Sequence, residues 1–220
     1  MKNNFLYFSS ILFLFFCISL SAQEIEINSS KIKYDDINKV TIFEGDVTSS
    51  DEKGNKFFSE YTEYNKPQKI FETKGKTKII TSGNYEVYSS NVIFDNKKNT
   101  ITSKEKTKIV DNDGNNIFVE MFNYSTLNNI FFSKGNIKIK DINNNEYNFS
   151  EIYVDEKKKK IIGTDIKALL NQPKISINNS NDPRFLANTM SYADNINTFD
   201  KGIFTYCENK GKDKCPPWTL

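Results

Sequence analysis

Residues Phe71 to Ile79 read FETKGKTKI, and similar stretches follow at intervals of 30 residues. The second is ITSKEKTKI at 101–109, the third is FFSKGNIKI at 131–139, and a weaker copy, FEGDV, occupies 43–47. Each full copy ends in Lys-Ile. A fixed period over several units indicates a repeat architecture, in which neighbouring units stack to bury a shared core.

Within each copy, small or apolar residues alternate with lysines. In the first copy one face would carry Phe71, Thr73, Gly75, Thr77 and Ile79, and the other Lys74, Lys76 and Lys78. Alternation with a period of two is typical of a half-buried strand, whereas a helix would scatter these positions around its axis. Glu105 falls on the inward face where the other units have Gly, so it marks either a rim or a break in the register.

A second strand-like run follows in each unit after a turn rich in Gly and Asn. The turn signals are Gly54-Asn55, Gly83-Asn84, Asp113-Gly114 and Asn143-Asn144-Asn145. These residues tolerate positive φ and suit hairpin connections. The runs after them, at 56–64, 85–94, 117–124 and 147–154, carry apolar residues on both faces. This pattern predicts strands that are covered on both sides or that present one face to an apolar ligand.

We therefore predict an all-β fold, a stacked antiparallel two-sheet β-jellyroll built from repeats of about 30 residues. The two sheets would close around an apolar slot with the lysines outward. The inward apolar residues would either fill an ordinary core or contact acyl chains, and they are Phe43, Val47, Phe71, Ile79, Ile101, Ile109, Phe131, Ile137 and Ile139.

The chain divides into three predicted parts. Residues 1–22 are expected to form a signal peptide, because Lys2 precedes an apolar run at 5–20 and Ser21 and Ala22 suit cleavage. A retained membrane anchor is the alternative, and a lipoprotein anchored through Cys17 would lack the usual small residues before that cysteine. Residues 23–170 hold the repeats. Residues 171–220 hold an Asn-rich loop, a final pair of repeat-like strands and a Cys-containing linker.

The composition excludes several classes of function. The 220-residue chain has a net charge of +2 and no His, which removes Ser-His-Asp catalysis and His-based metal sites and gives no general nucleic-acid footprint. No acid pair is clustered, so we predict neither an enzyme nor a cofactor or metal site. The abundance of Asn, Lys and Ile is interpreted mostly as a bias toward AT-rich codons. The run Lys157 to Lys160 predicts a solvated turn or, alternatively, a contact to lipid phosphates.

The repeats resemble a known family. Tyr34-Asp35 leading into FEGDV at 43–47 is similar to the OstA-like family of lipopolysaccharide-transport proteins. The tail, GIFTYC at 202–207 followed by CPPW at 215–218, resembles the segment that joins the N-terminal domain to the barrel in the outer-membrane assembly proteins of that family. The chain would then be truncated before a C-terminal barrel, since it lacks the alternating segments that a barrel needs.

The resemblance implies a β-jellyroll whose apolar interior carries the acyl chains of lipopolysaccharide at the periplasmic face of the outer membrane. Its implied partners are lipopolysaccharide, a periplasmic bridge protein that docks by edge-strand addition, and a plug lipoprotein held through the missing barrel. It also implies disulfides at Cys207 and Cys215, although no mature Cys precedes the repeats. A free periplasmic bridge protein and a structural β-repeat scaffold without a ligand are the alternatives.

Overall fold

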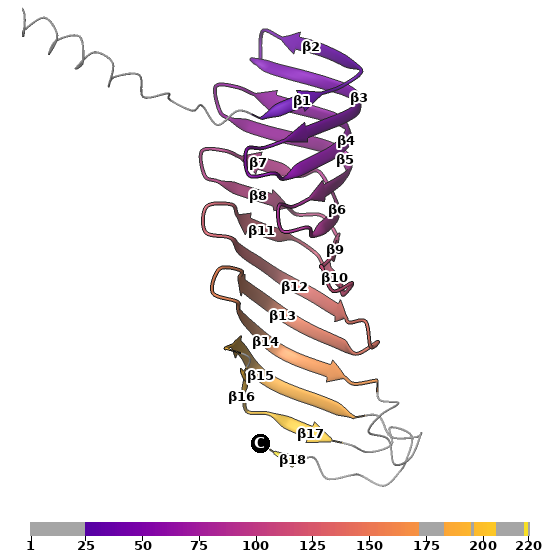
Figure 1. Cartoon of the computed structure of the whole chain (residues 1–220), viewed down its shortest axis with the longest axis vertical. Coiled ribbons are helices and arrows are strands. Elements are labelled where there is room, and N and C mark those ends of the chain that lie inside the picture. Colours follow the sequence, from indigo (N-terminus) through magenta and orange to yellow (C-terminus); the bar gives the residue numbers. More distant parts are fainter. Residues whose placement is uncertain (1–24, 172–182, 195, 206–217, 220) are drawn as a thin grey trace, which may run out of the picture.

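The computed structural model describes residues 25–171, 183–194, 196–205 and 218–219, and every regular element among them is a β-strand. The strands form one continuous sheet in which neighbours are antiparallel. They stack along the long axis of the molecule from β2 at one end to β17 and β18 at the other (Figure 1). The predicted all-β fold with stacked antiparallel units is confirmed, and the two predicted sheets are two parts of one bent sheet.

The strands follow the repeat along the chain. Their bounds are β1 Glu26–Asn28, β2 Lys31–Asp35, β3 Val40–Ser50, β4 Lys56–Asn65, β5 Ile70–Ile80, β6 Glu86–Ser90, β7 Ile93–Asp95, β8 Thr100–Ser103, β9 Thr107–Val110, β10 Asn116–Val119, β11 Phe122–Ser125, β12 Ile130–Lys140, β13 Glu146–Asp155, β14 Lys160–Leu169, β15 Arg184–Ala193, β16 Ile196–Asp200, β17 Ile203–Thr205 and β18 Trp218–Thr219.

The turns between strands keep the 30-residue period in their backbone geometry. Positive φ recurs at one set of turns in Lys39, Lys69, Asn99, Asn129 and Lys159, and at the other set in Gly54, Asn84, Gly114 and Asn144. Gly and Asn adopt this left-handed region at the lowest cost, which explains the turn signals in the sequence. Lys39, Lys69 and Lys159 adopt the same left-handed conformation at a higher backbone cost than Gly or Asn, and the tight turn imposes it on them.

Asparagine side chains tie successive turns together. Asp51 Oδ1 accepts hydrogen bonds from the backbone N–H of Lys53 at 3.0 Å and of Asn55 at 2.9 Å. Asn55 Oδ1 in turn accepts from the N–H of Ser82, one repeat further on, at 3.0 Å. The same link joins Asn115 to the N–H of Ile142 at 3.2 Å. Part of the Asn content is therefore structural, which the codon-bias interpretation missed.

Each long strand bends near its middle. Pairing shifts register between Glu44 and Val47 in β3 and between Lys134 and Ile137 in β12, and elsewhere the bend splits a strand in two, as between β8 and β9. Gly75 lies at the bend with φ of 75°. The prediction that Gly75 and Glu105 share the inward face is wrong, because both are exposed on the outside of the bend. Glu105 lies in the break between β8 and β9, whereas Gly75 lies within the continuous strand β5.

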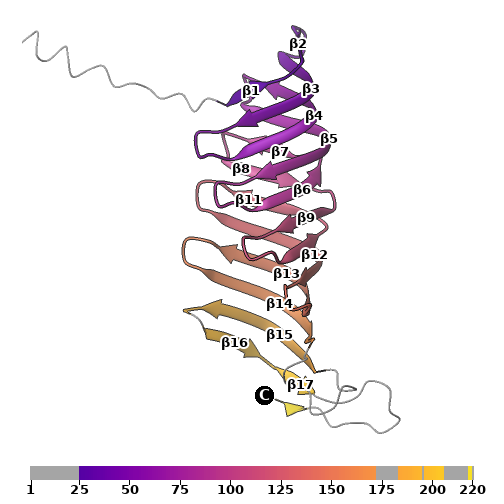
Figure 2. The same cartoon turned by 45° about the vertical axis from the view of Figure 1, so that its right-hand side comes forward.

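The bend divides the sheet into two walls. Wall A comprises residues 40–44, 61–65, 70–74, 93–95, 100–103, 122–125, 130–134, 151–155, 160–164 and 189–193, and wall B comprises 47–50, 56–59, 76–80, 86–90, 107–110, 116–119, 137–140, 146–149, 166–169 and 184–187. Both views show β7, β8 and β11 of wall A to the left of β6 and β9 of wall B (Figures 1 and 2). The inner faces of the two walls enclose the apolar core.

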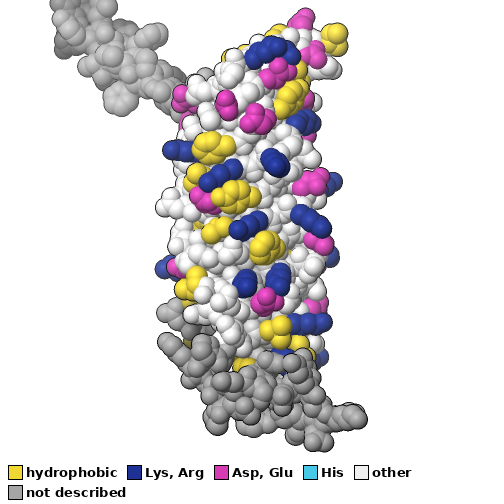
Figure 3. All heavy atoms as spheres, turned by 90° about the vertical axis from the view of Figure 1, so that its right-hand side faces the viewer, with side chains coloured by type: hydrophobic (Ala, Val, Ile, Leu, Met, Phe, Trp, Pro, Cys, Tyr) yellow, Lys and Arg dark blue, Asp and Glu magenta, His cyan; other side chains and the backbone are white. Residues whose placement is uncertain are grey.

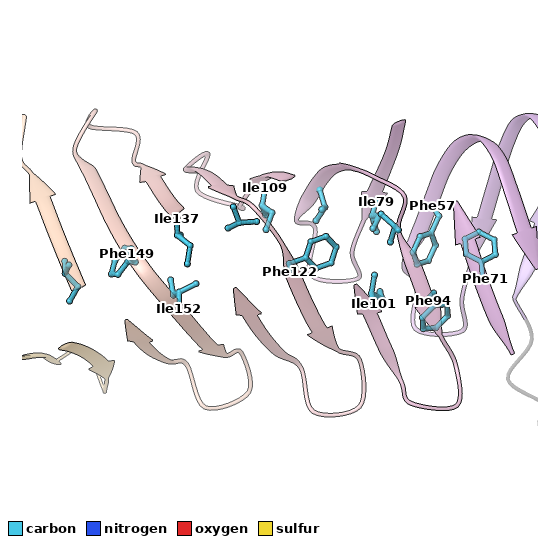
Figure 4. Packing of buried hydrophobic residues seen from close by; sticks show 14 of the residues in the cluster. Phe57, Phe71, Ile79, Phe94, Ile101, Ile109, Phe122, Ile137, Phe149 and Ile152 are labelled. Atoms are coloured by element: carbon cyan, nitrogen blue, oxygen red, sulfur yellow. The ribbon is translucent and has the colours of Figure 1, made fainter. Parts of the chain in front are cut away.

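Aromatic rings fill the space between the walls near the N-terminal end. Phe57 of wall B makes an edge contact with Phe71 of wall A, with ring centroids 5.5 Å apart, and stacks on Phe94 of wall A at 5.9 Å. All three side chains are buried. Inward side chains continue from this cluster along the stack (Figure 4). This end of the slot is an ordinary packed core.

Hydroxyl groups line the inside of the bend, where backbone pairing is interrupted. Thr77 Oγ1 donates to Thr73 Oγ1 at 2.6 Å, and Thr73 Oγ1 accepts from the N–H of Val92 at 3.0 Å. The hydroxyls of Ser89 and Thr107 lie 2.7 Å apart across the equivalent bend. Buried polar groups need such partners, so threonine and serine replace apolar residues at these inward positions.

The outer face of wall B alternates lysines with aromatic residues. Strand register places Lys78 between Phe58 and Tyr88, and Lys108 between Tyr88 and Phe118. The resulting pattern of yellow and dark blue side chains runs down the molecule in Figure 3. Tyr88 and Phe118 are 40% and 42% exposed. Among the described residues, Tyr88 on β6 and Phe118 on β10 therefore have no cover on the outer face, and the inner faces of β6, β10 and β13 line the cavity described next.

Candidate functional site

A cavity of ≈ 720 Å³ lies between the walls beyond the aromatic cluster. It extends from Ile79 on β5 to Phe204 on β17, and its lining is mostly aliphatic and aromatic. Ligand pockets in proteins commonly measure about 300–1,000 Å³ and share this apolar character with a few polar groups. The repeat thus produces a packed core at one end and an open apolar space over the rest of the stack.

An aromatic contact between the walls lies toward each end of the cavity. Phe57 and Phe94 stack on the N-terminal side, and neither ring lines the cavity. On the C-terminal side, Phe185 from wall B meets Phe199 on β16 with ring centroids 4.4 Å apart, and both rings line the cavity.

The structure divides the nine residues predicted to contact acyl chains into two groups. Five of them line the cavity, and they are Ile79, Ile101, Ile109, Phe131 and Ile139. The other four are buried in the core but are not part of the lining, and they are Phe43, Val47, Phe71 and Ile137. All nine are buried or line the cavity, and their contact with a lipid stays a prediction.

The second-run strands supply lining residues that the sequence reasoning left out. Val87, Ile117 and Tyr147 line the cavity from wall B at intervals of 30 residues. Phe122 and Ile152 do the same from wall A. The repeat that identified the first runs also spaces these positions, and it would have found them if alternation had been followed through the second runs.

Tyrosine hydroxyls and carboxylates form the polar part of the lining. Tyr124 Oη donates to Glu156 Oε2 at 3.1 Å, and Tyr147 Oη donates to Asp141 Oδ2 at 3.2 Å. Burial raises the pKa of Glu156 above its ordinary value, and the hydrogen bond from Tyr124 partly offsets this shift. Burial and the nearby charge of Glu156 raise the pKa of Tyr124 in turn. These phenols stay neutral at physiological pH and can face either water or an apolar ligand.

The N-terminal end of the sheet presents an edge strand. Within the described chain, β2 pairs only with β3. Its side chains include Ile32 and Tyr34, which are 60% and 61% exposed. Lys33 pairs with Glu44 at 2.7 Å across the same strand pair. Edge strands of this kind either carry charges that prevent aggregation or accept another strand, and β2 has features of both.

Several predictions concern residues outside the described ranges. Cys207 and Cys215, the signal peptide at 1–22 and most of the Asn-rich loop from 171 all lie there, so they stay predictions. The described part of the chain contains no helix that could cross a membrane. In that same part, no group of three or more His, Cys, Asp or Glu side chains is arranged to hold a metal ion.

The fold and the cavity define a β-repeat protein with an apolar compartment between the walls of a bent sheet. No protein-family model matches the sequence, and no curated protein matches it. Among solved structures, the chain is similar to LptH from Pseudomonas aeruginosa, the periplasmic LptA homologue of a lipopolysaccharide transport device. The two are 14% identical, with a TM-score of 0.27, and the match covers 63% of this chain and 80% of LptH.

Proposed function

We propose that this protein carries lipopolysaccharide, holding its acyl chains between the two walls of the sheet. The observation that supports this most is the cavity of ≈ 720 Å³ that follows the repeat. Transport of this kind needs no catalytic group. It needs only an apolar surface that replaces the membrane interior around the acyl chain. Burial of each CH₂ group on such a surface stabilises the bound lipid by about 0.8 kcal/mol.

The residues that we assign to chain contact are the lining set. From the predicted group these are Ile79, Ile101, Ile109, Phe131 and Ile139. The packed residues Phe43, Val47 and Phe71 would hold the walls together at the N-terminal end, because they are buried and lie outside the cavity lining. This division follows from which residues line the cavity, and it is the part of the proposal that mutations separate most easily.

The finer proposal concerns the place of the protein in transport. The tail motifs GIFTYC and CPPW support an assignment to the N-terminal domain of the LPS-assembly protein LptD, at the periplasmic face of the outer membrane. A bridge protein would then add a strand to the β2 edge, and a plug lipoprotein would be held by a barrel. A free periplasmic bridge like LptA would use the same edge and cavity. Fractionation of cells separates the two, because only the first stays with outer-membrane proteins.

The test is to purify the full chain from cells that make lipopolysaccharide and to quantify bound lipid by mass spectrometry. Ile117→Asp places a charge on the cavity wall, whereas Phe118→Asp places it on the outer face of the same strand. We expect lipid with the wild type and with Phe118→Asp, and a loss with Ile117→Asp. A wild-type protein that never carries lipid would support the scaffold alternative, in which the cavity stays dry.

A further inference from the structure

The two lips of the slot carry opposite charge. The basic lip consists of the wall A turns 35–39, 65–69, 95–99, 125–129 and 155–159, which hold eight lysines and five acidic residues. The acidic lip consists of the wall B turns 51–55, 81–85, 111–115 and 141–145, which hold five acidic residues and one lysine. The lysines of the repeat are therefore not all part of a uniformly solvated outer face, and the opening of the slot is electrically asymmetric.

Both lips border the cavity directly. Asp111 and Asp141 of the acidic lip and Glu156 of the basic lip are among the residues that line it. Nearer the N-terminal end the lips touch, since Lys53 Nζ donates to the carbonyl oxygen of Thr126 at 2.8 Å. A molecule whose chains enter the cavity would thus hold its headgroup between the two lips.

Some lip charges are already used within the protein. On the basic lip, Lys98 pairs with Asp95 at 2.9 Å, and Lys157 Nζ donates to the carbonyl oxygen of Leu127 at 3.1 Å. On the acidic lip, Asp111 and Asp141 accept hydrogen bonds from their own turns.

Other lip charges are available for a ligand. Within the described ranges, Lys97 and Lys159 of the basic lip and Asp113 of the acidic lip form no ion pair. Lys97, Lys159 and Asp113 are exposed.

We propose that the slot selects amphiphiles whose headgroup carries both a phosphate and an amine, with the phosphate along the basic lip and the amine along the acidic lip. This inference rests on the proposed function and names the headgroup chemistry of the same site. A headgroup of one sign would be attracted by one lip and repelled by the other, and screening over about 8–10 Å keeps both effects local to the slot. A headgroup with both signs gains from each lip.

The cavity also limits the apolar part of such a ligand. A cavity of about 150 Å³ admits one benzene ring. By that measure the ≈ 720 Å³ found here holds on the order of 30 carbon atoms. This corresponds to about a pair of acyl chains of ordinary length.

Competition between matched amphiphiles tests the headgroup inference. The full chain is loaded with the neutral probe N-phenyl-1-naphthylamine, and the probe is displaced with hexadecyl phosphoethanolamine, hexadecyl phosphate, hexadecylammonium or hexadecyl maltoside. We expect the phosphoethanolamine to displace the probe at a concentration about threefold below that of each single-charge compound, which is the scale of one exposed ion pair.

Charge variants test which lip binds the phosphate and which binds the amine. Lys97→Gln combined with Lys159→Asn should weaken binding of hexadecyl phosphate and strengthen that of hexadecylammonium, and Asn already occupies the equivalent turn position at Asn99 and Asn129. Asp113→Asn should do the reverse. The matched control is Lys104→Gln with Lys106→Gln, two exposed lysines outside the bend, which should change neither.

The outcomes separate the inference from the function on which it rests. Equal displacement by all four amphiphiles, or lip variants that behave like the control pair, would overturn the headgroup inference and leave lipid carriage intact. Failure of every amphiphile to displace the probe would remove both. The predicted order, with opposite effects of the two lip variants, supports both.

Discussion

Lys53 donates a hydrogen bond from Nζ to the carbonyl oxygen of Thr126 at 2.8 Å, although 73 residues separate them in the chain. Lys53 lies in a turn of wall B and Thr126 in a turn of wall A, so the bond links the two lips across the slot. It lies near the boundary between the packed aromatic cluster and the open cavity. The structure thus closes the slot on the side where the core is already filled.

Removal of this link should make the slot easier to open. Lys53→Ala is expected to lower the free energy of unfolding by no more than about 1 kcal/mol, the usual net value of a single hydrogen bond. Release of the neutral probe N-phenyl-1-naphthylamine, measured by stopped-flow fluorescence, should become faster. Lys56→Ala, at an exposed lysine on wall B, is the control. An unchanged release rate in Lys53→Ala would show that the link does not restrict the slot.

The glycines at the bend should be sensitive to substitution for reasons of backbone geometry. A Cβ at Gly75 would meet nothing within 4 Å, so Gly75→Ala should cost only the left-handed strain, about 1–2 kcal/mol. Gly75→Asn should cost less, because Asn tolerates this region, as Asn91 does with φ of 49°.

A second bend position provides the comparison. At Gly135 an added Cβ would lie 2.6 Å from Glu120 Oε2, so Gly135→Ala should add the small cost of displacing the flexible Glu120 side chain to the left-handed strain. Urea denaturation measures all three variants. Equal losses for Ala and Asn at position 75 would argue against strain as the cause.

The hydroxyls inside the bend should contribute through hydrogen bonds rather than size. Thr73→Val keeps the volume but leaves the buried N–H of Val92 without its acceptor, so we expect a loss of about 1–3 kcal/mol in the free energy of unfolding. Thr102→Val, on the outward face of β8, should be close to neutral. Chemical denaturation of both variants gives the difference, and equal effects would contradict a specific role for the bend.

Much of this fold follows from sequence because one repeat fixes both the period and the face. Ile79, Ile109 and Ile139 are spaced by 30 residues and all point inward, as alternation predicts. The bend could not be predicted from the sequence, because a Gly inside an alternating run is interpreted as a small inward residue. Only the positive φ of Gly45, Gly75 and Gly135 shows that the strands bend at these residues.

The boundary between core and cavity also could not be predicted. Phe71 and Ile79 belong to the same face of the same strand and have the same alternation. They differ because Phe57 and Phe94 from neighbouring strands pack around Phe71, whereas Ile79 borders open space. That difference depends on the distance between the walls, which no local pattern encodes. The edge strand at β2 depends likewise on how the stack ends.

The raised pKa of Glu156 predicts a dependence of stability on pH. Burial makes this carboxyl easier to protonate in the folded state than in the unfolded chain. Its favourable contribution is therefore complete below the ordinary Glu pKa, about 4.3, and is lost as the pH rises through the higher folded value. At pH 7 the ionised, partly buried carboxylate lowers the stability of the folded state. Gln at this position carries no charge and can still accept the hydrogen bond from Tyr124.

We therefore expect Glu156→Gln to be at least as stable as the wild type at pH 7 and to lose this advantage as the pH falls through the raised folded pKa of Glu156, so that none of it remains below about 4.3. Thermal unfolding of both proteins across this range measures the difference. Glu105→Gln, at an exposed position on the bend, is the control. A difference in melting temperature that stays constant with pH would show that ionisation of Glu156 is not coupled to folding.

The central claim is that the cavity between the walls holds the acyl chains of lipopolysaccharide. Ile109 lines the cavity, and its neighbour Lys108 points outward from the same strand. A photo-crosslinking amino acid at each position, activated in living cells, tests the claim directly. We expect lipopolysaccharide to attach at position 109 and not at position 108. Absence of lipopolysaccharide at 109, or equal capture at both positions, would contradict it.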